Sequence, residues 1–164
     1  MSRIKNYIIF VFLSFLFIAC TTQADTKISF GGYHFNTQKT PTLVGSTHES
    51  LVLHFKENEK LIFVHENYTS YDEYNVSATQ FIEIVFGGAI AENNQQLTFL
   101  KEQLALNEIK RSKLEIKGIT VYLIDYAHKK YAILFNSKQT QRWVAVEAQN
   151  MDLKKIILSL MKVG

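Results

Sequence analysis

The sequence predicts an α+β fold in which a mainly antiparallel sheet is packed by helices within a single domain. Strand-like segments precede and follow two segments in which apolar residues recur at helical spacing. Hydrophobic residues make up 47% of the chain and there is one proline, a composition typical of a packed core. A length of 164 residues suits one domain.

Residues 1–19 have the features of an export signal. Arg3 and Lys5 precede an uncharged, mostly apolar run from Tyr7 to Ala19. A helix of this run would span about 20 Å at 1.5 Å per residue, which is less than the roughly 30 Å hydrocarbon core of a bilayer. The pattern therefore favours a cleaved signal peptide over a permanent membrane span.

The segment Leu16-Phe17-Ile18-Ala19-Cys20 resembles the lipobox of bacterial lipoproteins, although Phe17 stands where that family usually has leucine. The resemblance covers the leader alone. It implies a diacylglyceryl thioether on Cys20 and a further acyl chain, such as palmitate, on its amine. Two or three chains would give durable anchoring. The polar stretch 20–26 would then be a lipidated tether, and 27–164 the α+β domain.

The same resemblance implies a place in the bacterial cell envelope, with the membrane as a partner through Cys20. Because Thr21 rather than aspartate follows the cysteine, a diderm cell would carry the protein on the periplasmic face of its outer membrane. Cleavage after Ala24 is the alternative, and it would release a soluble protein. With one cysteine, the chain forms no intramolecular disulfide and no Cys-based zinc cluster.

Charge argues against nucleic-acid binding. Without Arg3 and Lys5 the chain has 16 basic and 15 acidic residues, whereas a nucleic-acid interface needs a concentrated basic face. The densest basic group consists of Lys110, Arg111, Lys113 and Lys117. Since Glu108 and Glu115 interrupt this group, it is interpreted as a solvated strand or loop.

The first half of the domain predicts strands. Lys27 to Asn36 alternates as one strand, bent or bulged at Gly31-Gly32, and a loop follows through 37–50. Leu51 to Lys56 and Lys60 to Glu66 predict an antiparallel hairpin in which Glu57 faces Lys60. In that register the core face consists of Leu53, Phe55, Ile62 and Val64.

Two helices follow. Ser77 and Gln80 fit a capping box, and Gly87-Gly88 ends a helix over 78–87 that buries Phe81, Ile84 and Val85. A second helix is predicted from Asn94 to Leu106. Its buried stripe consists of Leu97, Leu100 and Leu104.

The last part of the chain predicts a strand meander and a closing helix. The strands are Lys113–Ile116, Ile119–Tyr126, Tyr131–Asn136 and Arg142–Ala148. The two central strands are apolar on both faces, so they should lie inside the sheet. Asn150 or Asp152 caps the last helix, whose stripe of Leu153, Ile156, Ile157, Leu160 and Met161 packs on the sheet. The element order resembles the Mog1/PsbP-like sandwiches of some small lipoproteins, as a fold analogy only.

His54 and His65 form a candidate metal pair. In the predicted register they lie diagonally on the face opposite the core, where a divalent ion could bridge them. No third ligand is identifiable, so two partly exposed strand histidines without a metal are the favoured interpretation. We expect no metal and no cofactor.

Tyr68, Tyr71 and Tyr74 recur every third residue, with Asp72 among them. Such an acidic, aromatic loop could contact a cationic or sugar-like ligand or a protein partner, because tyrosine gives large contact area at low entropic cost. A tyrosine-rich edge that packs on the sheet is the alternative. Trp143, next to Arg142, is interpreted as a core anchor rather than as a stacked recognition spot.

The sequence lacks the usual catalytic patterns. It contains no G-x-S-x-G elbow, no HExxH and no phosphate-binding glycine loop. The leading hypothesis is therefore a membrane-anchored, non-enzymatic binding or protein-interaction module, with an envelope protein as its candidate partner. The alternative is an envelope enzyme or metal-binding protein that uses His54, His65 and the loop from Tyr68 to Tyr74.

Overall fold

The computed structural model describes residues 25–67, 74–90, 94–136 and 142–162. They form a single domain with a large antiparallel sheet and few helices. Strands hold 46% of the residues and helices 22%, so the domain is richer in β structure than the predicted α+β class.

Seven strands form the large sheet in the order β3-β4-β5-β9-β8-β7-β6, with every neighbouring pair antiparallel. They are β3 (Leu43–Ser46), β4 (Ser50–His54), β5 (Lys60–Asn67), β6 (Glu108–Ile116), β7 (Ile119–Tyr126), β8 (Lys130–Phe135) and β9 (Arg142–Gln149). A smaller sheet has the order β1-β2-β10. Its strands are β1 (Thr26–Phe30), β2 (Tyr33–Thr37) and β10 (Met161–Lys162).

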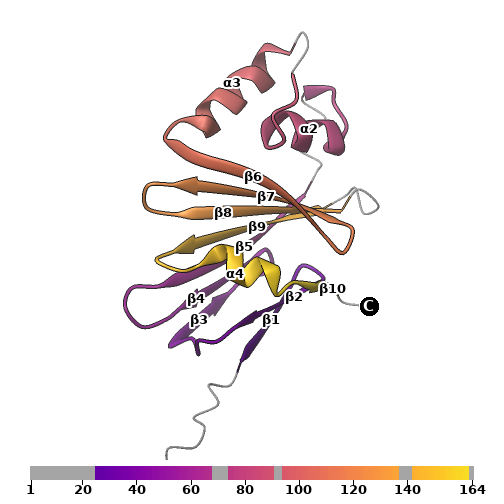
Figure 1. The fold of residues 1–164 in the computed structure, drawn as a ribbon. Coiled ribbons are helices and arrows are strands. Elements are labelled where there is room, and N and C mark those ends of the chain that lie inside the picture. Colours follow the sequence, from indigo (N-terminus) through magenta and orange to yellow (C-terminus); the bar gives the residue numbers. More distant parts are fainter. Residues whose placement is uncertain (1–24, 68–73, 91–93, 137–141, 163–164) are drawn as a thin grey trace, which may run out of the picture.

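The helices and the small sheet cover the two faces of the large sheet (Figure 1). Helix α4 (Leu153–Leu158) packs with β1 and β2 on one face. Helices α2 (Ala78–Val85) and α3 (Gln95–Ala105) pack on the other, over β7, β8 and the start of β9. The chain enters β1 at one end of the molecule, and α2 and α3 lie at the opposite end (Figure 1).

Several elements agree closely with the sequence prediction. Strand β7 has the predicted bounds, and β7 and β8 both lie inside the sheet. Ser77 and Gln80 form the predicted capping box of α2, and Asn94 caps α3. Asp152 caps α4, and Leu153, Ile156, Ile157 and Leu160 of the predicted stripe are buried, whereas Met161 belongs to β10 and not to the helix.

The predicted single strand over 27–36 is wrong, because Gly31-Gly32 is the turn of a hairpin between β1 and β2. Phe30 pairs directly with Tyr33, and both glycines have positive φ (61° and 77°), the conformation of a tight two-residue hairpin turn. A Cβ on Gly31 would lie 2.5 Å from Val144 Cγ2 and 2.6 Å from His65 Nε2. At Gly31 the turn therefore packs too closely on the large sheet to admit a side chain, whereas a Cβ on Gly32 would meet no atom within 4 Å.

The predicted loop over 37–50 contains a strand. Leu43–Ser46 pairs with β4 and forms one edge of the large sheet. All four residues are exposed, so the segment lacks the alternation by which a half-buried strand is recognised.

The predicted register of the hairpin between β4 and β5 is also wrong. Leu53 pairs with Leu61, and Phe63 is fully buried. The connection is longer than expected, because Glu57 and Asn58 have positive φ and Phe55 N–H donates to the carbonyl of Glu59 (2.9 Å). The core face thus consists of Leu53, Phe55, Leu61 and Phe63, whereas Ile62 and Val64 lie on the other face.

Over the residues that the structure describes, every helix is too short or too polar to cross a membrane.

Candidate functional site

The most distinctive cavity is an apolar groove of about 690 Å³ between α3 and the large sheet. Its apolar lining comes from the end of α2, the end of α3 and strands β7 to β9. These residues are Phe86, Leu104, Leu106, Ile124, Ile133, Trp143 and Ala145. We call this cavity the α3 groove.

The groove exists because α3 is anchored firmly at its start and covers the sheet incompletely at its end. Asn94 accepts a hydrogen bond from Leu97 N–H (3.0 Å) and donates to the carbonyl of Tyr74 (2.8 Å). Leu97 is fully buried, whereas Leu100 and Leu104 are only half-buried. The C-terminal part of the helix therefore leaves space above β7, β8 and β9.

Two tyrosines form the polar part of the groove wall. The rings of Tyr126 and Tyr131 meet edge to face, with centroids 5.6 Å apart. Tyr126 donates its hydroxyl hydrogen to the carbonyl of Leu104 (2.5 Å), and Tyr131 donates to Glu147. Burial raises the pKa of both phenols. Both hydroxyls therefore stay protonated near neutral pH and already have an acceptor.

Lys129 and Glu147 lie beside Tyr131. Burial alone would raise the pKa of Glu147, but hydrogen bonds from Tyr131 and Gln149, together with Lys129, outweigh it and hold the pKa below its usual value. Lys129 Nζ is 4.8 Å from the centroid of the Tyr131 ring and 3.9 Å from Glu147. Tyr131 and Gln149 therefore both lie closer to the Glu147 carboxylate than the Lys129 ammonium group does. The Lys129 side chain remains about half exposed at the rim of the groove.

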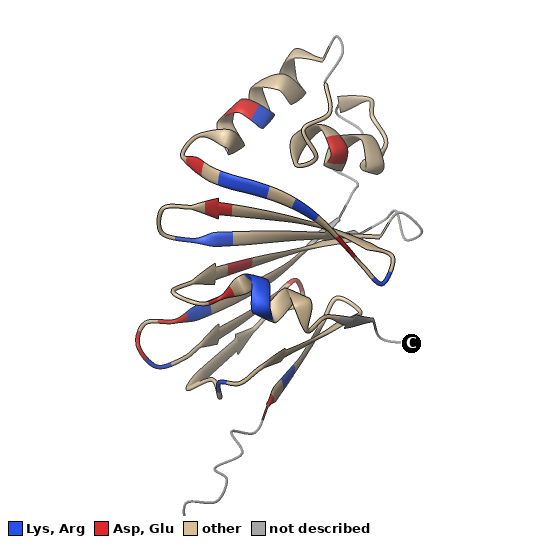
Figure 2. Cartoon of the chain, viewed as in Figure 1, with Lys and Arg blue, Asp and Glu red and all other residues tan. Residues whose placement is uncertain are grey.

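Exposed apolar side chains surround α3. Ile90, Phe99, Leu106 and Ile109 are each between 58% and 81% exposed. Few charges lie on α2 and α3, in contrast to β6 (Figure 2). Leu106 both lines the groove and reaches solvent, so it forms an apolar lip.

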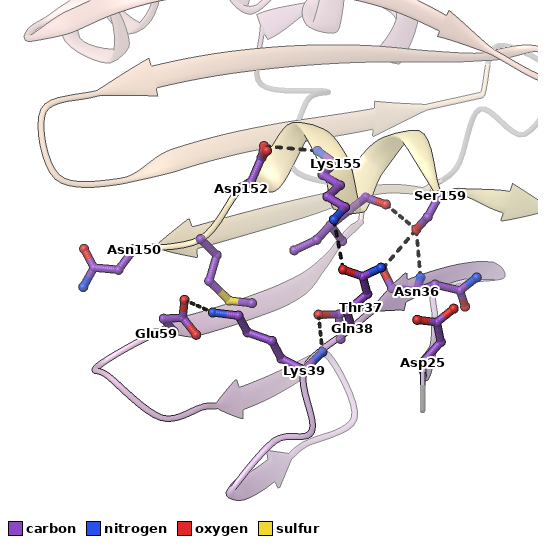
Figure 3. A pocket seen from close by; sticks show the side chains of 12 residues that line it. Asp25, Asn36, Thr37, Gln38, Lys39, Glu59, Asn150, Asp152, Lys155 and Ser159 are labelled. Atoms are coloured by element: carbon purple, nitrogen blue, oxygen red, sulfur yellow. Dashed lines mark hydrogen bonds and ion pairs between the residues drawn. The ribbon is translucent and has the colours of Figure 1, made fainter. Parts of the chain in front are cut away.

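A second cavity, of about 470 Å³, lies between β2, the start of β5 and α4 (Figure 3). It is polar, and its side chains largely bond to one another. Lys39 pairs with Glu59, and Lys155 Nζ donates to Gln38 (3.0 Å). Ser159 Oγ accepts from Asn36 N–H (2.8 Å). These contacts hold α4 against β2, so the cavity is primarily a structural junction, although the buried Asn36 Oδ1 has no partner in the described part of the chain.

Most of the predicted site residues lie outside the described residues or serve in packing. Cys20, Tyr68, Tyr71 and Asp72 are outside the described ranges. Tyr74 is half-buried, and its ring packs on Phe81 with centroids 5.7 Å apart. Tyr74 therefore supports α2 rather than standing free at the surface.

The structure does not bring the two histidines together. His54 pairs with Lys60, whereas His65 lies two residues beyond Phe63 and shares its face. The two side chains thus project from opposite faces of the sheet, and the predicted diagonal contact is wrong. His65 instead packs edge to face on Phe30, with centroids 5.0 Å apart. Within the described ranges, no three His, Cys, Asp or Glu side chains gather closely enough to hold a metal.

The interpretation of the basic residues of β6 as a solvated strand or loop holds only in part. The segment is strand β6, with Lys110 exposed and Lys113 about half exposed, but the Arg111 side chain is only 20% exposed and bonds to its neighbours. Arg111 bonds to Glu108 and to the carbonyls of Val85 and Phe86 at the end of α2. Lys113 pairs with Glu83 (3.1 Å).

Trp143 is 8% exposed and packs on Phe86, with ring centroids 5.4 Å apart, as the core-anchor interpretation predicts. It also lines the α3 groove, which the sequence did not indicate. One signal was available: Phe99 and Leu106 are large apolar residues outside the predicted stripe of the second helix. These two additional apolar residues indicate that the helix has more apolar surface than it can bury against the sheet.

Comparisons with protein-family models, with curated proteins and with solved structures found no match for this chain.

Proposed function

We propose that this protein is a lipid-anchored, non-enzymatic binding module of the bacterial envelope, and that the α3 groove is its ligand site. The observation that carries the proposal is the groove itself, which combines a volume of about 690 Å³ with a mainly apolar wall. Small-molecule sites are typically concave, largely apolar and roughly 300–1,000 Å³ in volume.

The chemistry of the wall supports binding rather than catalysis. The hydroxyls of Tyr126 and Tyr131 already donate to acceptors, and the pKa values of both phenols are raised. They are therefore poor nucleophiles and poor bases near neutral pH. Glu147 is held as a carboxylate by its donors, so it is a weak general acid.

The anchor supports a particular orientation. β1 begins only a few residues after Cys20 and lies at the end of the molecule opposite α2 and α3. Acyl chains on Cys20 would therefore hold the domain with its groove directed away from the anchoring membrane.

The anchor is tested by the intact mass of the membrane-fraction protein, for wild type and Cys20→Ala. We expect acyl mass on a mature chain that begins at Cys20, and neither acyl mass nor membrane retention in the variant. A wild-type chain that begins at Asp25 would mean processing after Ala24 and would overturn the anchor.

The groove is tested with N-phenyl-1-naphthylamine, an uncharged apolar fluorophore. Trp143 is the only tryptophan in the chain, so energy transfer from tryptophan to the probe reports proximity to the groove. Ala145→Leu, which fills part of the groove, should weaken binding at least tenfold, whereas Leu158→Gln, at an exposed position of α4, should leave binding unchanged. Equal binding by both variants, or no binding by wild type, would refute the site.

A further inference from the structure

We infer that the ligand of the α3 groove is a long-chain fatty acid, with its acyl chain inside the groove and its carboxylate beside Lys129. This inference rests on the proposed function and names the ligand class for the same site. Three features of the described residues carry it: the hydrogen-bonding state of the wall, the apolar lip and the position of the one cation at the mouth.

The hydrogen-bonding state of the wall distinguishes an acyl chain from a peptide. Tyr126 and Tyr131 already donate to the Leu104 carbonyl and to Glu147. The other polar lining residues, Gln103, Asn107, His128 and Lys129, are exposed at the rim. A peptide inside the groove would bury backbone N–H and C=O groups away from these partners, which is unfavourable. A hydrocarbon chain has no polar group to satisfy, so it fits this wall.

The lip gives the chain a way in. Leu106 lies at the C-cap of α3, lines the groove and is more than half exposed. Phe99 and Ile109 add exposed apolar surface on α3 and just after it. Exposed apolar surface of this kind is uncommon on a monomer unless it serves an interaction. An acyl chain entering past Leu106 would contact apolar surface from solvent to the groove wall.

Charge decides the head group. Lys129 Nζ is 3.9 Å from Glu147, whose carboxylate accepts hydrogen bonds from Tyr131 and Gln149 (2.6 Å to Gln149). The ammonium group is about half exposed and carries three donors, so it can bind a second carboxylate at the mouth. Lys130, the next residue, is opposite Asp125 and on the other face of the sheet. Lys130 is therefore a matched control for Lys129.

The test uses stearate with two bromine atoms at mid-chain, because bromine quenches tryptophan fluorescence only near contact. We expect brominated stearate to quench Trp143 and unlabelled stearate to reverse the quenching. Each methylene removed from the chain of the unlabelled competitor should weaken its affinity for the groove by up to about fourfold. Ala145→Leu should lose quenching, and so should Leu106→Gln. Because Leu106 is 58% exposed, Leu106→Gln should keep the thermal stability of wild type.

The head group is tested by Lys129→Gln. We expect Lys129→Gln to bind stearate roughly tenfold more weakly than wild type, and to bind the uncharged methyl ester of stearate as tightly as wild type. The control Lys130→Gln should bind both molecules as wild type does. Equal stearate affinity for the two lysine variants would overturn the assignment of the carboxylate. If brominated lysophosphatidylcholine quenches Trp143 more strongly than brominated stearate does, the ligand is a phospholipid and not a free fatty acid.

The outcomes separate the two proposals. If N-phenyl-1-naphthylamine binds in the groove but brominated stearate neither quenches Trp143 nor displaces the probe, the fatty-acid inference is wrong and the proposed function stands. If neither molecule binds, both fail.

Discussion

Arg111 joins helix α2 to strand β6. Its guanidinium group bonds to Glu108 and donates to the carbonyls of Val85 (3.1 Å) and Phe86 (2.9 Å). The last carbonyls of a helix lack partners within the helix, so this contact satisfies groups that burial would otherwise leave unpaired. A planar, multidentate cation is well suited to that geometry.

We expect Arg111→Ala to lower the free energy of unfolding by about 2 kcal/mol, since charge-assisted hydrogen bonds to buried acceptors are lost. Arg111→Lys should lose about half as much, because one ammonium group cannot reach all the acceptors. Urea denaturation measures both. Lys110→Ala, an exposed neighbour, is the control and should change stability by under about 0.5 kcal/mol. A loss as large for Lys110→Ala would contradict the assignment.

Glu147 gives stability a pH dependence. Its pKa is lowered in the folded state by Tyr131, Gln149 and Lys129, against the opposing effect of burial. A depressed carboxylate pKa stabilises the fold above the unfolded value of about 4.3, and this contribution is lost as pH falls through the folded value. The unfolding free energy should therefore fall less steeply with acidification in Glu147→Gln than in wild type. Denaturation at pH values from 6 to 2.5 measures the slope, with Glu102→Gln on exposed α3 as a control. If the unfolding free energy fell with pH by the same amount in wild type and in Glu147→Gln, the stabilising role of the Glu147 carboxylate would be contradicted.

Strand β3 is an edge without protective charges. Leu43, Val44 and Gly45 are exposed, and no charged residue lies between Pro41 and Thr47. The opposite edge, β6, carries Lys110, Arg111 and Lys113. Exposed apolar edges tend to pair with other chains, and a lysine on the edge suppresses such pairing.

Val44→Lys should therefore reduce self-association without changing stability by more than about 0.5 kcal/mol. Light scattering against concentration measures association, and thermal unfolding measures stability. Leu158→Lys introduces the same charge at an exposed position of α4, outside the strands, and should leave association unchanged. If both variants reduce association equally, net charge and not the edge is responsible.

Helix α3 was predictable from the local sequence pattern, but the groove beside it was not. Its start, its cap at Asn94 and its buried Leu97 were all predictable, because capping and helical spacing are local. The groove was not, since it depends on how far the end of the helix stands from strands that follow later in the chain. The hydrogen bond from the Tyr126 hydroxyl to the carbonyl of Leu104 likewise joins β7 to the end of α3, so helical spacing does not predict it.

The large sheet carries a separate hydrophobic cluster on each of its two faces. One hydrophobic cluster joins α4, β1, β2 and the large sheet, whereas the other joins α2 and α3 to its opposite face. The α3 groove is space left within the second cluster's face. The groove wall is mainly apolar and open to solvent, so a side chain that covers part of this wall should favour folding.

We expect Ala145→Leu to raise the free energy of unfolding by about 1 kcal/mol while it weakens ligand binding. Calorimetric unfolding with and without stearate tests this prediction. In wild type, stearate should raise the Tm, because a ligand bound only by the folded state stabilises it, and in the variant it should not. A variant less stable than wild type would mean that the groove is already filled to its packing limit.

The elements that could be predicted from the sequence alone are those with local signals: the caps at Ser77 and Asn94, the cap of α4 as either Asn150 or Asp152, the strand 119–126, a strand within one residue of 130–135, and an antiparallel, helix-packed sheet. Three features could be seen only in the folded chain: the pairing of Leu53 with Leu61, the opposite faces of His54 and His65, and the α3 groove. This difference arises because caps and hydrophobic periodicity depend on residues that are close together in the sequence. Register, by contrast, depends on loop geometry, and a one-residue change in it exchanges the faces of a whole strand.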